Sequence, residues 1–119
     1  MGSSTTTFGM PVLNLKLTAI LAELRQRLVN LYGNRLVTTV LYGSQARGDA
    51  EPGSDIDVMV VLKAPVQPCL EVDRSGGILT EVSLAFDELV SCVFVSEQDF
   101  ATRKTPLLMN VRREGVIVC

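Results

Sequence analysis

The sequence predicts an α/β domain of the α+β type, in which helices lie mainly on one face of a mixed β-sheet in the order α-β-β-α-β-α-α. Three observations support this prediction. A helical repeat of leucines opens the chain, two Val-rich runs flank a polar Gly-rich loop, and one helical segment separates the second run from a third. A helix that connects two strands allows a mixed sheet with helices on one side.

The N-terminal third of the chain predicts a tail and an amphipathic helix. Residues 1–10 are small and polar, so we expect a disordered tail followed by one domain over 11–119, although Met10 could itself be the natural start. From Pro11 onward, apolar residues recur at steps of three and four until Gly33-Asn34, which supplies a left-handed helix stop. The apolar positions of this helix are Leu13, Leu17, Ile20, Leu21, Leu24, Leu28 and Leu31.

Two strands and a second helix follow. The runs 36–42 and 58–62 are bounded by Gly, Pro and Ser, which is typical of strands. The prolines of 64–68 mark a loop, and 69–86 has a helical pattern. Gly76-Gly77 predicts a kink or a loop inside that pattern, so a regular helix is expected only from Ile78 to Phe86.

The last third of the chain predicts one more strand and two short helices. The apolar run 89–95 is the third strand, and Ser96 with Asp99 resembles a capping box for a helix to about Arg103. Thr105-Pro106 begins a helix that reaches Glu114, before Gly115. Residues 116–118 form a short strand or an extended tail.

Composition limits the classes of function. The 119 residues include 47% hydrophobic and 20% charged residues, as in an ordinary globular protein, and the net charge of −2 gives no basic field for nucleic acid. Histidine is absent, which excludes a Ser-His triad and a His-ligated zinc site. The three cysteines fit free thiols in a reducing cytoplasm, and the sequence has neither a signal peptide nor a membrane-length apolar stretch. We therefore expect a cytoplasmic protein.

Two carboxylates open the second strand. Because side chains alternate along a strand, Asp55 and Asp57 point to the same face. At about 6 Å and an effective dielectric near 20, their charges repel by roughly 3 kcal/mol. Alone they could be a solvated pair at a strand start, but in a partly covered site they need a cation, and carboxylate oxygens suit Mg²⁺.

The end of the first strand supplies the complementary half of a site. Gly43 can take a positive φ and lets backbone approach a ligand closely. A turn of exposed N–H groups with the Ser44 hydroxyl can hold phosphate oxygens, although Ser is also common in plain turns. A phosphate cradle beside a metal-holding pair is typical of phosphoryl or nucleotidyl transfer.

These residues resemble a known signature. The segments 43–48 (Gly-Ser-Gln-Ala-Arg-Gly) and 54–58 (Ser-Asp-Ile-Asp-Val) are similar to the motif of minimal nucleotidyltransferases of the polymerase-beta-like superfamily. Small members resemble antitoxins that are paired with HEPN ribonuclease toxins. The resemblance implies that Mg²⁺ and ATP are used and that AMP is transferred to an acceptor hydroxyl, a tyrosine of a partner HEPN toxin.

The resemblance also assigns roles. Asp55 and Asp57 would be catalytic metal ligands, and Gly43, Ser44 and Arg47 would bind nucleotide phosphates, although Arg47 could also be an ordinary loop arginine. The family carries a third carboxylate on the strand after the connecting helix, whereas 89–95 contains no acid. Of Asp87 and Glu88, which precede that strand, we select Glu88, because it shares a face with Val90, Cys92 and Phe94.

Two other functions remain open. The same fold could neutralise a partner by contact, with a site that is weak because the third acid is missing. An aminoglycoside-type resistance enzyme is disfavoured, because this length leaves no second domain for a small acceptor. The oligomeric state, including association of identical chains, and the donor base are not fixed by the sequence.

Overall fold

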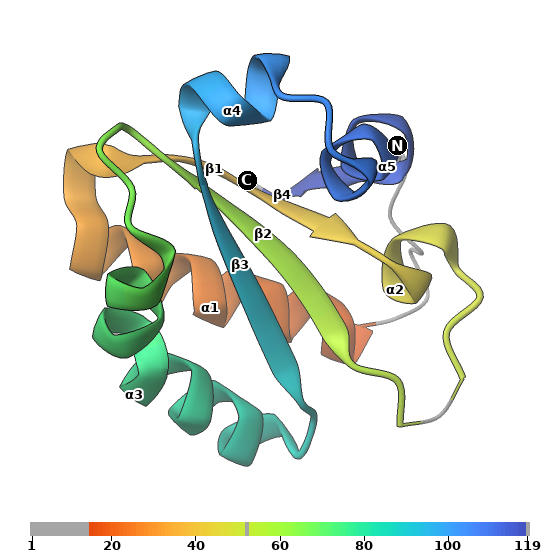
Figure 1. The fold of residues 1–119 in the computed structure, drawn as a ribbon. Helices are drawn as coiled ribbons and strands as arrows, with labels where there is room; N and C mark the ends of the chain where they lie inside the picture. Colours follow the sequence, from red (N-terminus) through yellow and green to blue (C-terminus); the bar gives the residue numbers. More distant parts are fainter. Residues whose placement is uncertain (1–14, 52, 119) are drawn as a thin grey trace, which may run out of the picture.

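The computed structural model describes residues 15–51 and 53–118, which form one mixed sheet with flanking helices (Figure 1). The tail expected over 1–10, and the helical residues expected before Leu15, lie outside the described residues. The predicted α-β-β-α-β-α-α order is present, with a short helix and a terminal strand in addition. The elements are α1 (Leu15–Tyr32), a 3-10 turn (Gly33–Arg35), β1 (Leu36–Tyr42), α2 (Ser44–Arg47), β2 (Ile56–Leu62), α3 (Pro68–Phe86), β3 (Val90–Ser96), α4 (Glu97–Thr102), α5 (Pro106–Glu114) and β4 (Val116–Val118).

The sheet has the order β3-β2-β1-β4 and is mixed, as predicted. β1 is antiparallel to both β2 and β4, whereas β2 and β3 run parallel because α3 returns the chain between them. The segment 116–118 is therefore a strand and not an extended tail. It pairs with the middle of β1, where Val40 faces Ile117.

Apolar residues bury both faces of the sheet. The two long helices, α1 and α3, cover one face, as the predicted placement of helices mainly on one side requires, and α5 covers part of the other face (Figure 1). The α1 face receives the even-numbered side chains of β2, and the α5 face receives Met59 and Val61. Consequently β2 is buried on both sides for most of its length.

The helix α3 is continuous through Gly76-Gly77, so the predicted kink or loop at these glycines was wrong. Each glycine costs a helix about 1 kcal/mol relative to alanine. The helix tolerates this cost because Val82 is fully buried on its inner side, and the Ser75 hydroxyl donates to the Glu71 carbonyl at 2.8 Å. Among the described residues, no heavy atom outside the neighbouring backbone of α3 lies within 4 Å of the place where a Cβ would stand at either glycine.

A buried carboxylate joins α1 to α3. Glu71 is only 2% exposed, and its Oε1 accepts a hydrogen bond of 2.9 Å from the Tyr32 hydroxyl. The guanidinium groups of Arg35 and Arg74 lie 3.4 Å from its two oxygens. Burial first, and then the bond to Glu71, raise the pKa of the Tyr32 hydroxyl well above its usual range. This cluster fixes the C-terminal end of α1 against the first turn of α3.

The short C-terminal helices are capped as predicted. Ser96 Oγ accepts from the Asp99 amide at 3.1 Å, and Thr105 Oγ1 accepts from the Leu108 amide at 3.2 Å. The side chain of Arg112, on α5, donates to the carbonyls of Phe100 (2.9 Å), Asp99 (3.1 Å) and Arg103. One arginine therefore ties α5 to α4. Within the described part of the chain, no helix has the length and apolar content needed to span a bilayer.

Removing the Tyr32 hydroxyl should destabilise the fold. Tyr32→Phe deletes a hydrogen bond to a buried charge, which we expect to lower the free energy of unfolding by about 1.5–3 kcal/mol. The comparison is Glu81→Gln, which breaks the exposed ion pair with Arg27 and should cost no more than about 1 kcal/mol. Urea unfolding of both variants measures the difference, and equal losses would contradict a structural role for the Glu71 cluster.

Candidate active site

The two motif aspartates lie at the start of β2, on the face that α5 partly covers. Asp55 is exposed and immediately precedes the strand, whereas Asp57 is half-buried within it. Asp57 is paired with Tyr42 on β1 and with Ser91 on β3. Alternation puts it on the same face as Met59. Asp57 therefore lies between the end of β1 and the starts of β2 and β3, and Asp55 is close enough for its charge to affect the pKa of Asp57.

The Gly43 backbone and the Asp57 carboxylate are in close contact. Gly43 has φ 76° and ψ −157°, a conformation that is essentially restricted to glycine. A Cβ placed on Gly43 would stand 2.7 Å from Asp57 Oδ2. A side chain here would therefore displace the Asp57 carboxylate and would also strain the backbone. The structure thus brings together the Gly-Ser half and the Asp-Ile-Asp half of the sequence motif.

A tight turn follows Gly43. The amides of Ala46 and Arg47 donate to the Gly43 carbonyl at 3.1 and 3.2 Å, which closes the single-turn helix α2. Among the described residues, none forms a hydrogen bond with the Ser44 hydroxyl. Ser44 can therefore bind a ligand oxygen without first breaking a bond within the protein.

The loop between α2 and β2 is closed on itself. The Ser54 amide donates to the Glu51 carbonyl, and the Glu51 amide donates to Ser54 Oγ, both at 3.0 Å. Gln45 Nε2 donates to the Ser54 carbonyl at 3.4 Å, which links the loop back to α2. These bonds determine where the chain enters Asp55.

Arg47 lies near the site, but its guanidinium group contacts two carboxylates. Its Nε is 3.1 Å from Asp49 Oδ2, and its Nη1 is 3.8 Å from Glu114 Oε1 on α5. A cavity of about 110 Å³ lies beside it. The residues that line this cavity are Tyr42, Gly43, Arg47, Leu107, Asn110, Val111 and Glu114.

The electrostatics of the site favour a cation. Partial burial first, and then the charge of Asp55, raise the pKa of the Asp57 carboxyl above its usual value. Burial first, and then the Asp57 charge, raise the pKa of Tyr42 to about 12. Over the residues that the structure describes, no group of three or more acidic, Cys or His side chains could hold a metal. Two carboxylates suit Mg²⁺, which usually keeps several waters and takes phosphate oxygens from a substrate.

The structure does not bring Glu88 to the aspartate pair. Its carboxylate lies 2.9 Å from Lys16 Nζ on α1. Glu88 does share a face with Val90 and Phe94, but both pack in the core against α1 and α3, on the side of the sheet opposite Asp57. The β3 residue that faces Asp57 is Ser91. Ser91 is the one polar residue inside the otherwise apolar run 89–95, and this feature of the sequence could have identified the position.

Sequence reasoning also missed the wall that α5 contributes. Asn110 and Glu114 line the cavity beside Gly43, and Tyr42 borders Asp57. Tyr42 could have been noticed because it directly precedes the motif. Nothing in the sequence of α5 indicated that this helix would pack against β1 beside the site.

Comparisons with known proteins agree with this geometry. A family model described as a nucleotidyltransferase domain matches residues 21–104, which is more than half of the chain. The chain belongs to the nucleotidyltransferase domain family. Together with its relatives, this membership makes it a nucleotidyltransferase, as the motif predicted.

Two relatives come from Methanocaldococcus jannaschii, and both are named as candidate protein adenylyltransferases. The chain is 30% identical to MJ0141 over 105 residues, which cover 87% of this chain and 100% of that protein. It is 29% identical to MJ1305 over 99 residues, covering 80% of this chain and 66% of that protein.

Solved structures share the nucleotidyltransferase fold. A chain of a toxin–antitoxin complex crystallised with AMP-PNP matches with a TM-score of 0.57 at 19% identity, over 87% of this chain and 71% of its own length. A chain of a variant MntA–HpeT toxin–antitoxin complex matches with a TM-score of 0.56 at 18% identity, over 78% and 68%. At these identities the likeness concerns the fold alone.

Gly43→Ala should disrupt the site, because the new Cβ would collide with the Asp57 carboxylate and the backbone conformation is essentially glycine-only. Gly48→Ala is the comparison, since Gly48 also has a positive φ (81°) but has no atom within 4 Å of its would-be Cβ. Gly48→Ala should cost about 1–2 kcal/mol of stability and keep any stabilisation by Mg²⁺. Gly43→Ala should cost more and lose the stabilisation by Mg²⁺. The measurement is the thermal unfolding temperature of both variants with and without Mg²⁺. If Mg²⁺ still raised the unfolding temperature of Gly43→Ala, the close contact would be refuted.

The raised pKa of Asp57 makes stability depend on pH. Because the folded state holds this proton more tightly than the unfolded state, the contribution of Asp57 to stability is present at low pH and is lost as pH rises through its folded pKa. Without metal, Asp57→Asn should therefore unfold at higher urea than the wild type at pH 7, and should lose less stability between acidic and neutral pH. Asp73→Asn, which changes an exposed carboxylate on α3, is the control. An Asp57→Asn curve parallel to the wild type would contradict the pKa shift.

Proposed function

We propose that this chain transfers AMP from ATP to a hydroxyl of a protein partner, a tyrosine of a HEPN-type toxin, and thereby acts as an antitoxin. The observation that carries the proposal is the contact between the Gly43 backbone and the Asp57 carboxylate. This contact holds the phosphate-binding turn and the carboxylate pair within reach of one triphosphate. In this proposal Asp55 and Asp57 hold Mg²⁺, which when bound would offset the charge of the phosphates and of the transition state.

The roles of the remaining motif residues follow from their positions. Ser44, whose hydroxyl has no hydrogen-bond partner among the described residues, donates to a phosphate oxygen beside the Gly43 turn. Arg47 exchanges its contacts with Asp49 and Glu114 for the triphosphate, because a phosphate carries more charge than either carboxylate. Tyr42 and Asn110 bound the neighbouring cavity and limit how far the nucleotide can extend toward α5.

In the reaction, the acceptor oxygen forms a bond to the α-phosphorus while the bond from that phosphorus to the bridging oxygen of the β-phosphate breaks. Pyrophosphate leaves, and the acceptor hydroxyl loses its proton. The β3 residue facing Asp57 is Ser91, which cannot serve as a carboxylate base. In our proposal the proton therefore goes to water or to a base that the partner brings, and transfer without the partner is slow.

A protein acceptor is supported by the relatives. MJ0141, which this chain matches along its entire length, is named as a candidate protein adenylyltransferase. Chains of toxin–antitoxin complexes share the fold, and one of these complexes was crystallised with the ATP analogue AMP-PNP. These likenesses favour ATP as donor and a toxin as partner over a small-molecule acceptor.

A second candidate function is neutralisation of a partner by contact alone. The observation that favours it is the absence of an acid from β3, where Ser91 is paired with Asp57. The resemblance described above implies a third carboxylate on this strand. A weak site of this kind could still bind a nucleotide. The two functions differ in whether a covalent bond to AMP forms.

The deciding experiment is transfer of label from ATP labelled at the α-phosphate, with Mg²⁺, in lysate of the native host. The purified chain is compared with the double variant Asp55→Asn/Asp57→Asn and with the surface control Asp73→Asn. We expect a labelled protein band with the wild type and with Asp73→Asn but not with the double variant, and mass spectrometry then identifies the modified residue. Label on a small molecule would refute a protein acceptor. No label, with a partner that still co-purifies, would leave only the contact function.

A further inference from the structure

The strand β3 forms one edge of the sheet, and no other strand of the described chain pairs with its outer side (Figure 1). The Leu89 carbonyl accepts from the Ile56 amide, so the backbone hydrogen-bonding groups of Leu89 point toward β2. The amide of the next residue, Val90, points away from β2 and donates to Ser83 Oγ on α3. Because these directions alternate along a strand, Cys92 and Phe94 present their N–H and C=O groups to the outside.

Beyond the Val90 amide, which Ser83 of α3 already bonds, this edge lacks the features that usually prevent pairing. Exposed edge strands commonly carry Lys or Pro, a bulge, or an inward-pointing charge. β3 is seven residues long, Val-Ser-Cys-Val-Phe-Val-Ser, and contains no charged residue and no proline. The irregularity that the described sheet does contain lies between Leu36 and Thr38, on β1. The β3 edge is therefore open to another strand.

We propose that a second copy of this chain pairs with β3 in antiparallel orientation, about a two-fold axis that passes through Val93. In this register residues 91–95 of the two strands overlap, whereas the Val90 amide keeps its bond to Ser83 Oγ. Cys92 of each copy then stands opposite Phe94 of the other, and both direct their backbone groups outward, as a hydrogen-bonded pair requires. Such a contact is isologous and closes with two copies. The two four-stranded sheets become one continuous sheet.

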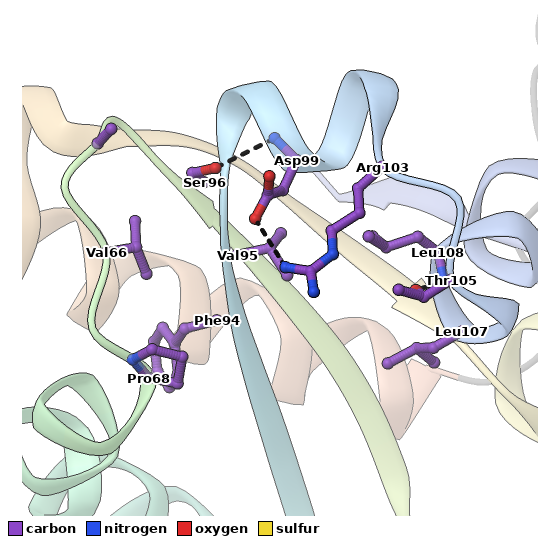
Figure 2. A pocket seen from close by; sticks show the side chains of 11 residues that line it. Val66, Pro68, Phe94, Val95, Ser96, Asp99, Arg103, Thr105, Leu107 and Leu108 are labelled. Atoms are coloured by element: carbon purple, nitrogen blue, oxygen red, sulfur yellow. Dashed lines mark hydrogen bonds and ion pairs between the residues drawn. The ribbon is translucent and has the colours of Figure 1, made fainter.

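The flanking side chains fit the same register. Leu89, at the start of β3, is 59% exposed although it is apolar. Continuing the register puts Leu89 beside Val95 of the second copy, because the two residues are diagonal neighbours on the same face. Val95 borders a cavity of about 380 Å³ at the far end of β3 from the aspartates, where Val66 and Pro68 lie on one side and Leu107 and Leu108 on the other (Figure 2). Each Leu89 thus reaches the apolar mouth of the other copy's cavity.

The helix α3 also has a surface suited to this contact. Ser83 lies on the outer side of β3, and positions seven and eleven residues earlier share its side of the helix. They are Gly76, which has open space around its would-be Cβ, and Val72, which is 50% exposed. Gly76 lies near the middle of α3, where a two-fold axis through the middle of β3 would bring the two helices together. Glycine permits a close approach there, and nothing within the single described chain requires it.

The dimer would also border the active site. Ser91, which faces Asp57, stands opposite Val95 of the second copy in this register. The second β3 strand would therefore form the side of the site that is open in the single chain.

The oligomeric state in solution tests the proposal. We expect light scattering after gel filtration to give a dimer for the wild type. Leu89→Ser and Gly76→Gln should each raise the dimer dissociation constant at least about ten-fold, because each changes a residue at the contact. Gly76→Gln separates interface from fold, since the helix itself should gain stability from the change. Ile117→Ser, on the opposite sheet edge at β4 and 51% exposed in the wild type, should leave the dimer intact.

A disulfide tests the register. In a chain whose native cysteines are replaced by alanine, Val93→Cys should form a reducible covalent dimer on mild oxidation, because the residue faces its own copy across the axis. Ile117→Cys in the same background should form no covalent dimer, because residue 117 lies on the opposite sheet edge. A wild type that is monomeric at high concentration would overturn the proposal, even if a foreign partner binds the edge. So would a dimer that is broken by Ile117→Ser but not by Leu89→Ser or Gly76→Gln.

Discussion

The site depends on one close contact, that of the Asp57 carboxylate with the Gly43 backbone. Antiparallel pairing of β1 and β2 brings the end of one strand to the start of the other, so residues 14 positions apart become neighbours. A side chain at Gly43 would displace the Asp57 carboxylate, which is partly buried and whose pKa is raised above its usual value. An unfavourable charge is therefore kept beside the Gly43 turn. In the function proposed above, a cation and a polyanion bound together would offset that charge.

The sheet can hold this charge because its interior is apolar on both faces. The α1 leucines bury one side of β2, and α5 buries Met59 and Val61 on the other. The aspartates lie where this apolar cover stops, because Asp55 is exposed just before β2 and Asp57 is half-buried at its second position. From Val58 to Leu62 the strand is fully buried, so a carboxylate there could not be solvated.

Most of the fold could be predicted from local patterns, because the helical repeat of α1, the caps at Ser96 and Thr105 and the Val-rich strands all agree with their tertiary surroundings. The prediction at Gly76-Gly77 was wrong because the low helix propensity of the two glycines is outweighed by tertiary contacts of α3. These contacts are the burial of Val82 and the bonds of Glu71 to Tyr32 and Arg35. The motif residues Gly43, Asp55 and Asp57 were brought together as expected. Glu88 was not brought to them. Because β2 is apolar on both faces, the sequence pattern does not show which face of the sheet carries the aspartates, and so it does not show which residues of β3 lie on that face. The contribution of α5 could not be predicted, since it depends on tertiary packing alone.

The three carbonyl contacts of Arg112 have a mechanical consequence. They join α4 and α5 into one unit, which leaves the sheet at the end of β3 and returns to it beside β1. Because α5 also supplies Asn110 and Glu114 to the cavity beside Gly43, the position of that wall depends on α4 as well as on β1. A helix at the far end of β3 from the aspartates therefore helps to position the surroundings of the motif residues.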